Sequence, residues 1–260
     1  MRKSLMVAAL LGTFAAPAAV MAEEAAAPAS PHTFSYNIGL YSQYIFRGLT
    51  QTAEKPAVQG GVDYSHASGL YVGAWGSNIS WLQDFGAYSE SSAEIDVYGG
   101  YKNTIGETGI SYDVGLLQYY YPGNVKSGFT NANTTEVYGA LGWKWITAKY
   151  SHALTNAFGV ADSKDTYYAE LNATVPVFDT GISVIAHVGK QEFNGSGNDI
   201  ASYSDWKLGA VKSWDNGINV GGYYTDTDAD KGFYTPVNAG GKVGEYIGKE
   251  QFTVFVQKTF

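Results

Sequence analysis

The stretch "FSYNIGLYSQYIFRG", Phe34 to Gly48, shows the pattern that decides the fold. Every second residue from Phe34 to Leu40 is apolar or aromatic, Tyr44 and Phe46 continue the same set, and the residues between them are mostly polar. Successive side chains of a β-strand point to opposite faces, so this period of two predicts a strand with one apolar and one polar environment. A helix is excluded here because it would spread both sets around its circumference.

The same alternation recurs along the chain up to its last residue. We expect twelve strands, near residues 34–47, 57–65, 70–78, 93–102, 109–120, 135–145, 146–154, 166–176, 180–190, 203–212, 217–226 and 250–260. The links between them alternate between short turns and long polar segments, so short and long links fall at opposite ends of the structure. Outer-membrane barrels have this asymmetry, with short periplasmic turns and long extracellular loops.

Composition agrees with an exported all-β protein. The chain has 21 Tyr, 12 Phe, 6 Trp and 32 Gly but only 7 Pro, and these residue types favour strands and tight turns. Residues 1–22 combine a basic start, an apolar run and a small-residue cleavage site, which predicts a cleaved signal peptide. Residues 23–33 are rich in Ala and Pro and predict a flexible leader, and residues 34–260 form the single expected domain.

The apolar set of each strand separates a membrane barrel from a soluble β-sandwich. Tyr and Trp recur near the ends of the expected strands, where a membrane barrel has girdles at the lipid headgroups. Eleven residues belong to this set: Tyr36, Tyr44, Tyr64, Tyr101, Tyr112, Trp143, Trp145, Tyr150, Tyr167, Trp206 and Tyr224. A sandwich core would have to bury many Tyr hydroxyls with partners. We therefore predict an antiparallel transmembrane β-barrel of about twelve strands in the bacterial outer membrane.

Residues 35–81, from "SYNIGLYSQYIFRGLTQT" through "SNISW", resemble the opening of the TorF family of outer-membrane porins. The later stretches "AEIDVYGGY", "TTEVYGALGW", "TYYAELNATVP" and "ISVIAHVGKQEF" are similar to successive strands of that family. The resemblance implies an outer-membrane barrel and a passive channel for small solutes.

Charged residues of the polar set are the candidate pore lining: Arg47, Asp63, Glu94, Asp96, Asp113, Glu136, Lys144, Lys149, Glu170 and Lys207. Acids outnumber bases among them, and an acidic wall lowers the electrostatic barrier for cations. We expect a porin-like channel with a mild cation preference, whose partners are outer-membrane lipid and small solutes or ions. The alternative is an outer-membrane barrel without channel function, with a surface-binding or structural role.

No other chemistry is indicated strongly. The net charge of −8 argues against nucleic acid as a partner. A His and a Ser two positions apart could form the core of an outer-membrane lipid hydrolase, and only His66 and Ser68 have this spacing, without an identifiable third group. The stretch "TDTDADKGF" lacks the final Glu of a calcium loop. We expect no catalytic residues, no metal and no cofactor.

The last stretch, "EQFTVFVQKTF", predicts the strand that closes the barrel against the first one. Phe252, Val254 and Val256 are expected on the lipid face, and Phe255 inside the barrel. A terminal Phe260 resembles the signal that the outer-membrane barrel assembly machinery recognises, although Lys258 stands where many such ends carry an aromatic residue.

Overall fold

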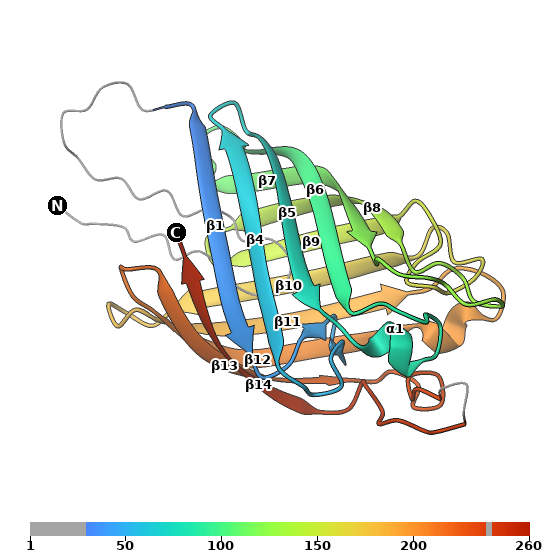
Figure 1. Cartoon of the computed structure of the whole chain (residues 1–260). Coiled ribbons are helices and arrows are strands. Elements are labelled where there is room, and N and C mark those ends of the chain that lie inside the picture. Colours follow the sequence, from blue (N-terminus) through green and yellow to red (C-terminus); the bar gives the residue numbers. More distant parts are fainter. Residues whose placement is uncertain (1–29, 238–240) are drawn as a thin grey trace.

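The chain folds into a closed antiparallel β-barrel (Figure 1). The structure, a computed structural model, describes residues 30–237 and 241–260. The barrel wall within these ranges is formed by β1 (His32–Tyr41), β4 (Ala57–His66), β5 (Leu70–Asn78), β6 (Ala93–Thr104), β7 (Ile110–Tyr120), β8 (Thr134–Trp143), β9 (Ile146–Ala153), β10 (Tyr167–Pro176), β11 (Ile182–Glu192), β12 (Tyr203–Ser213), β13 (Ile218–Thr227) and β14 (Gln251–Thr259). Each strand pairs with its neighbour along the chain, and β1 pairs with β14, which confirms the predicted all-β barrel of about twelve strands.

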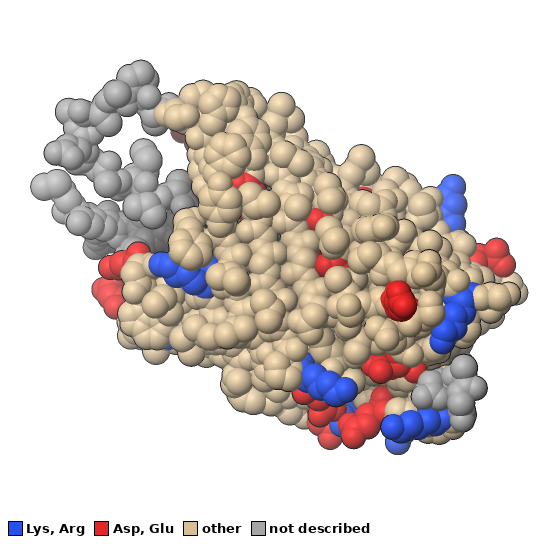
Figure 2. Space-filling view, viewed as in Figure 1, with Lys and Arg blue, Asp and Glu red and all other residues tan. Residues whose placement is uncertain are grey.

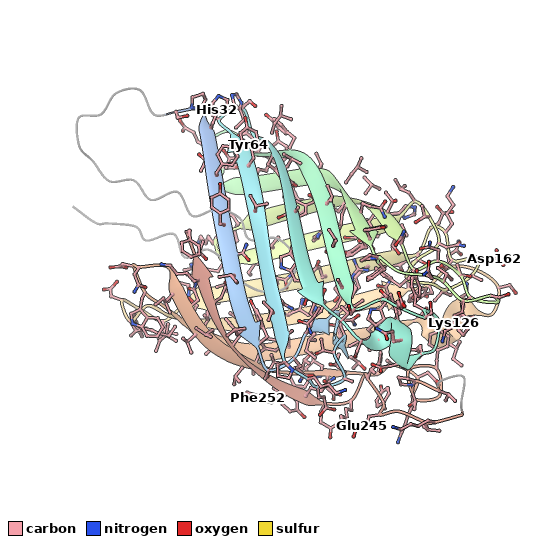
Figure 3. All side chains as sticks on the ribbon, in the orientation of Figure 1. His32, Tyr64, Lys126, Asp162, Glu245 and Phe252 are labelled. Carbon is pink, nitrogen blue, oxygen red and sulfur yellow. The ribbon has the colours of Figure 1, made fainter. Side chains whose placement is uncertain are left out.

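The links divide the barrel into two unlike ends. Short turns (67–69, 105–109, 144–145, 177–181 and 214–217) lie at one end, here the short-turn end, and segments of ten or more residues lie at the other, here the loop end. The long links hold the only regular elements outside the wall in the described ranges: β2 (Ile45–Phe46), β3 (Leu49–Thr50), α1 (Trp81–Asp84) and η1 (Asn198–Ala201). Figure 3 labels His32 and Tyr64 at the short-turn end and Lys126, Asp162 and Glu245 at the loop end.

The first strand differs from its predicted bounds at both ends. It begins at His32, inside the predicted leader, and it ends at Tyr41 instead of continuing to Arg47. Beyond Tyr41 the backbone N–H of Ser42 donates to the carbonyl of Val254 at 2.9 Å, and the chain then leaves the wall and turns into the barrel. Residues 1–22 and the first part of the leader lie outside the described residues.

The barrel is apolar outside and polar inside. On β14, Phe252 and Val254 are 63% and 49% exposed, whereas the polar side chains of Gln251 and Thr253 are 5% and 0% exposed. Phe255 lies on the inner face as predicted, where its ring stacks on Tyr41 with centroids 5.2 Å apart. Water-soluble proteins bury apolar surface and expose polar surface, so this arrangement requires an apolar solvent outside the wall.

Candidate channel lumen and the inward hairpin

The outer face of the wall carries an apolar belt. Charged side chains on the outward positions of the described strands occur only near the strand ends: Lys190, Glu192 and Asp226 toward the loop end, and Lys212 and Lys258 toward the short-turn end. The side chains between are mostly Val, Leu, Ile, Ala, Gly and aromatic residues, and the polar pair Gln118 and Thr135 near the loop end is joined by a hydrogen bond of 2.6 Å. Figure 2 shows Lys and Arg near the two ends of the molecule, with a mostly tan surface between them.

Aromatic residues border this belt on both sides. Near the loop end the outward ring includes Tyr120, Tyr150, Tyr167, Trp206, Tyr224 and Phe252, and near the short-turn end it includes Tyr36, Tyr64, Tyr101, Tyr112, Trp143, Trp145 and Trp214. The expectation for Tyr44 was wrong. Its ring is 4% exposed inside the barrel, and its hydroxyl donates to Glu94 Oε1 at 2.6 Å.

Residues 43–52 form a hairpin, built on β2 and β3, that folds into the barrel; we call it the inward hairpin. Its turn residues Arg47 (φ 45°) and Gly48 (φ 81°) both adopt the left-handed conformation, as a tight two-residue hairpin turn requires. A Cβ on Gly48 would lie only 2.6 Å from the Cβ of Asp205 on β12. Glycine is therefore needed here for both the backbone conformation and the close approach to the wall.

Arg47 fastens the tip of the inward hairpin to the opposite wall. Its guanidinium forms an ion pair with Glu136 on β8 (Nη2 to Oε2, 2.8 Å) and donates to Gln191 Oε1 on β11 at 2.8 Å. The guanidinium carbon also lies 4.3 Å from the ring centroid of Tyr168 on β10. The side chains of Arg47 and Glu136 are only 7% and 2% exposed. Because β1, from which the hairpin leaves, lies on the other side of the ring, the hairpin crosses most of the lumen.

Two carboxylates of β6 lie on the inner wall near the base of the inward hairpin. Glu94 and Asp96 are 1% and 2% exposed. Glu94 accepts from Tyr44 through one oxygen, while Glu94 Oε2 and Asp96 Oδ1 have no hydrogen-bond partner among the described residues. Buried acceptors of this kind are usually satisfied by water or by protonation.

The remaining predicted pore-lining residues of the strands also lie on the inner face. Asp63 and Asp113 each accept a hydrogen bond at 2.6 Å, from the hydroxyls of Tyr98 and Tyr71. Glu170 accepts from Asn172 at 2.7 Å. Lys149 and Lys207 place their ammonium groups over rings, 4.6 Å from the centroid of Tyr138 and 5.2 Å from that of Tyr223.

Lys144 is the exception, and its predicted place on the inner face was wrong. It lies in the turn between β8 and β9 with φ 53°, and its ammonium group is 4.4 Å from the ring centroid of Trp143 at the exposed rim. The turn occupies only residues 144 and 145, because β9 begins at Ile146. Extending the alternation of β8 through this stretch therefore assigned an inner face to a residue that has left the wall.

A second polar cluster on β10, β11 and β12 was missed. His187 Nε2 lies 2.9 Å from Asp205 Oδ1, and the Tyr168 hydroxyl donates to Asp205 Oδ2 at 2.7 Å. His187 Nδ1 lies 2.7 Å from the amide oxygen of Asn172. Asp205 has the same strand parity as Lys207, so the alternation already contained the signal that would have found it.

The outer loops are fastened to one another at the loop end. Lys249 forms ion pairs with Glu54 at 2.5 Å and Glu245 at 2.6 Å, which joins the 228–250 loop to the segment after the inward hairpin. The hydrogen bonds to Glu245 and Glu54 raise the pKa of Lys249, and the bond to Lys249 lowers the pKa of Glu245. These ion pairs are therefore retained at neutral pH and weaken as acid protonates the carboxylates.

His66 and Ser68 do meet, with Nδ1 and Oγ 2.8 Å apart, in the exposed turn at the short-turn end. Among the described residues no carboxylate hydrogen bonds to His66, so the group that would orient it for hydrolysis is missing there. The same part of the chain holds no group of three or more His, Cys, Asp or Glu placed to bind a metal. It also contains no helix long and apolar enough to cross a membrane.

The chain belongs to a family described as "bacterial protein of unknown function (Gcw_chp)", whose model matches residues 25–260. No curated protein matches it. Among solved structures it is similar to the KdgM porin in complex with disordered oligogalacturonate, with 9% identity, 87% of this chain and 98% of that chain covered and a TM-score of 0.49. It is also similar to an outer membrane channel from Pseudomonas putida, with 13% identity, 93% and 100% coverage and a TM-score of 0.48. These likenesses are remote, and the barrel assignment rests on the strand pairing. The resemblance to the TorF porins stays a prediction.

Proposed function

We propose that this chain is an outer-membrane channel for small solutes, exported by a signal peptide that is cleaved near residue 22. The observation that carries the proposal is the inverted wall: an apolar belt between two aromatic rings outside, and carboxylates, lysines and tyrosine hydroxyls inside. In lipid this wall buries apolar surface and leaves no backbone group unpaired, because the barrel is closed. A polar inner wall of this kind can be wetted and can line a path for small polar solutes.

A mild preference for cations follows from the inner wall. Among the described residues of the wall and the inward hairpin, seven inward carboxylates (Asp63, Glu94, Asp96, Asp113, Glu136, Glu170 and Asp205) face four inward bases (Arg47, Lys102, Lys149 and Lys207). Arg47 and Glu136 neutralise each other, so the balance that remains is acidic. An acidic wall lowers the energy of a cation in the lumen and raises that of an anion.

The double variant Glu94→Gln, Asp96→Asn is expected to reduce this preference. At about 10 Å in water one unit charge changes the energy of a passing ion by about 0.4 kcal/mol, which is about twofold in permeability. The change has opposite sign for K⁺ and Cl⁻, so each removed carboxylate should lower the ratio of K⁺ to Cl⁻ permeability roughly fourfold. The measurement is the reversal potential of refolded protein in a planar bilayer under a KCl gradient. Glu107→Gln, the same chemical change in an exposed turn, is the matched control. If the unaltered protein preferred anions, the proposed cation preference would be refuted.

The inward hairpin favours one alternative: a barrel that stays closed and serves a surface-binding or structural role. Tyr44 and Arg47 reach the wall at β6, β8 and β11, so the hairpin leaves little free cross-section at its level. Single-channel recording separates the two functions. Absence of conductance in protein that migrates as a heat-modifiable barrel would support the closed barrel.

Deleting Phe260 is expected to lower the yield of assembled barrel severalfold while leaving the conductance of assembled molecules unchanged. The residue adds a pair of backbone hydrogen bonds to the closing seam, N–H to the Tyr36 carbonyl at 2.9 Å and carbonyl from the Tyr36 N–H at 3.4 Å. Its side chain is 68% exposed, as recognition by the assembly machinery requires. Heat-modifiable mobility in outer-membrane fractions measures the yield.

Phe260→Ala keeps the backbone bonds and tests the side chain alone. Phe178→Ala is its control, because this side chain is 92% exposed in the turn 177–181 at the same end of the barrel. Normal yields for both Phe260 variants would show that the terminal residue is not an assembly signal.

A further inference from the structure

A cavity of about 280 Å³ lies at the loop end, on the outer side of the inward hairpin. Ten of its nineteen lining residues are aromatic, and none of the nineteen is charged. The rings come from segments far apart in the chain, including Phe46 of the hairpin, Trp81 of α1, Phe158, Phe193 and Phe233 of three later loops. We call this the aromatic vestibule.

The walls of the vestibule are held in place by contacts among themselves. The rings of Trp81 and Tyr121 meet edge to face with centroids 5.6 Å apart, and those of Phe46 and Phe158 do so at 5.5 Å. The hydroxyl of Tyr234 donates to the carbonyl of Ala201 at 2.5 Å, which joins the last long loop to η1. A site formed in advance costs little ordering when a ligand enters.

The polar groups of the lining restrict what it can bind. The side chain of Gln191 is occupied by Arg47 and by the Tyr167 carbonyl, and the amide of Gln51 donates to the Leu49 carbonyl. The vestibule therefore offers a large apolar surface, and the indole N–H of Trp81 is a buried donor without a partner among the described residues.

We propose that the aromatic vestibule binds a small uncharged aromatic compound with one hydrogen-bond acceptor, to which the indole N–H of Trp81 donates. An apolar cavity of about 150 Å³ takes one benzene, so the volume here suits two fused rings. A sugar could also stack on aromatic rings, but it would lose the hydrogen bonds of several hydroxyls, and this mostly apolar lining would replace only some of them. The inference goes beyond the proposed channel, because binding here does not require conductance.

The position of the vestibule connects it to the hairpin. Phe46 and Phe158 line it and also cover the guanidinium of Arg47, whose central carbon lies 4.9 Å and 5.4 Å from their ring centroids. A bound ring therefore rests on the two side chains that shield the buried ion pair. A compound that passes into the lumen from this side has to pass the inward hairpin.

The test uses the full mature chain refolded in lipid nanodiscs, with 2-naphthol as the probe and empty nanodiscs as the blank, since detergent could fill the vestibule. We expect saturable binding in a titration followed by calorimetry. Val160→Trp fills the cavity and should abolish binding, whereas Ile200→Trp, at a half-exposed residue of η1 outside the lining, should not. Trp81→Phe keeps a ring but removes the donor, so it should weaken 2-naphthol about three- to tenfold, as the loss of one hydrogen bond predicts, and leave naphthalene binding unchanged.

Equal binding by the Val160→Trp and Ile200→Trp variants, binding no greater than to empty nanodiscs, or saturable glucose binding without 2-naphthol binding would each overturn the inference. Conductance is recorded in parallel on the same preparations. Protein that binds 2-naphthol but does not conduct would leave the vestibule standing and remove the proposed channel. Protein that conducts but does not bind 2-naphthol would support the proposed channel and refute binding in the vestibule.

Discussion

Replacing Arg47 with alanine is expected to release the inward hairpin and widen the lumen. The ion pair of Arg47 with Glu136 is almost fully buried, and breaking such a pair by removing one partner costs about 3–5 kcal/mol. The variant also loses the hydrogen bond to Gln191 and the contact with the Tyr168 ring. A loss of about 3 kcal/mol changes the ratio of inserted to released hairpin roughly a hundredfold.

Single-channel recording measures this change as longer or larger open events. Glu136→Gln removes the same ion pair from the wall side, so it should act in the same direction while the hairpin sequence stays intact. Lys55→Ala, at an exposed base of the same link, is the matched control and should behave like the unaltered protein. Unchanged conductance in both the Arg47 and Glu136 variants, with heat-modifiable mobility retained, would show that the ion pair does not keep the hairpin in the lumen.

The alternation of side chains was sufficient to predict the wall. The last strand illustrates why: Phe252, Val254 and Val256 point outward, and Phe255, the one large apolar residue of the other set, packs inside on Tyr41. In a barrel whose two faces meet different solvents, a shift of one residue in the register of a strand would move each of its side chains to the opposite face. The pattern therefore has to be kept along the whole strand.

The inward hairpin could not be predicted in the same way. Tyr44 and Phe46 continue the apolar set of β1, yet both lie inside the barrel, because the chain leaves the wall after Tyr41. Alternation records that neighbouring side chains meet different surroundings, but it does not distinguish lipid from a packed lumen. The only clue was Gly48, which suits the second position of a left-handed two-residue turn, but the alternation places it at the end of the strand.

The partners of the inner charges depend on register, which one sequence does not give. Asp205 could be placed on the inner face from its parity with Lys207. Its contact with His187 follows only from the pairing of β11 with β12, in which His187 lies opposite Lys207 and one inward position from Asp205. The Arg47–Glu136 pair joins residues 89 apart in sequence, and it exists because the hairpin crosses the lumen.

Leu116→Arg tests the membrane assignment itself. Leu116 lies near the middle of β7, opposite Gly99 of β6 and Val137 of β8, and is 53% exposed on the outer face. An arginine at the midplane of a lipid bilayer costs about 2–4 kcal/mol on the outside of a barrel. On the surface of a water-soluble protein the same substitution usually changes stability by no more than about 0.5 kcal/mol.

The measurement is the free energy of unfolding in urea for protein folded into lipid vesicles. Ile110→Arg, at the short-turn end of the same strand, is the control, since an arginine near the interface costs about 0–1 kcal/mol. A large loss at Leu116 with a small one at Ile110 is the depth dependence that only lipid imposes, because water surrounds every outward position of a soluble barrel alike. Equal, small effects at both positions would mean that the apolar belt is covered by something other than a bilayer, and the channel proposal would fall with it.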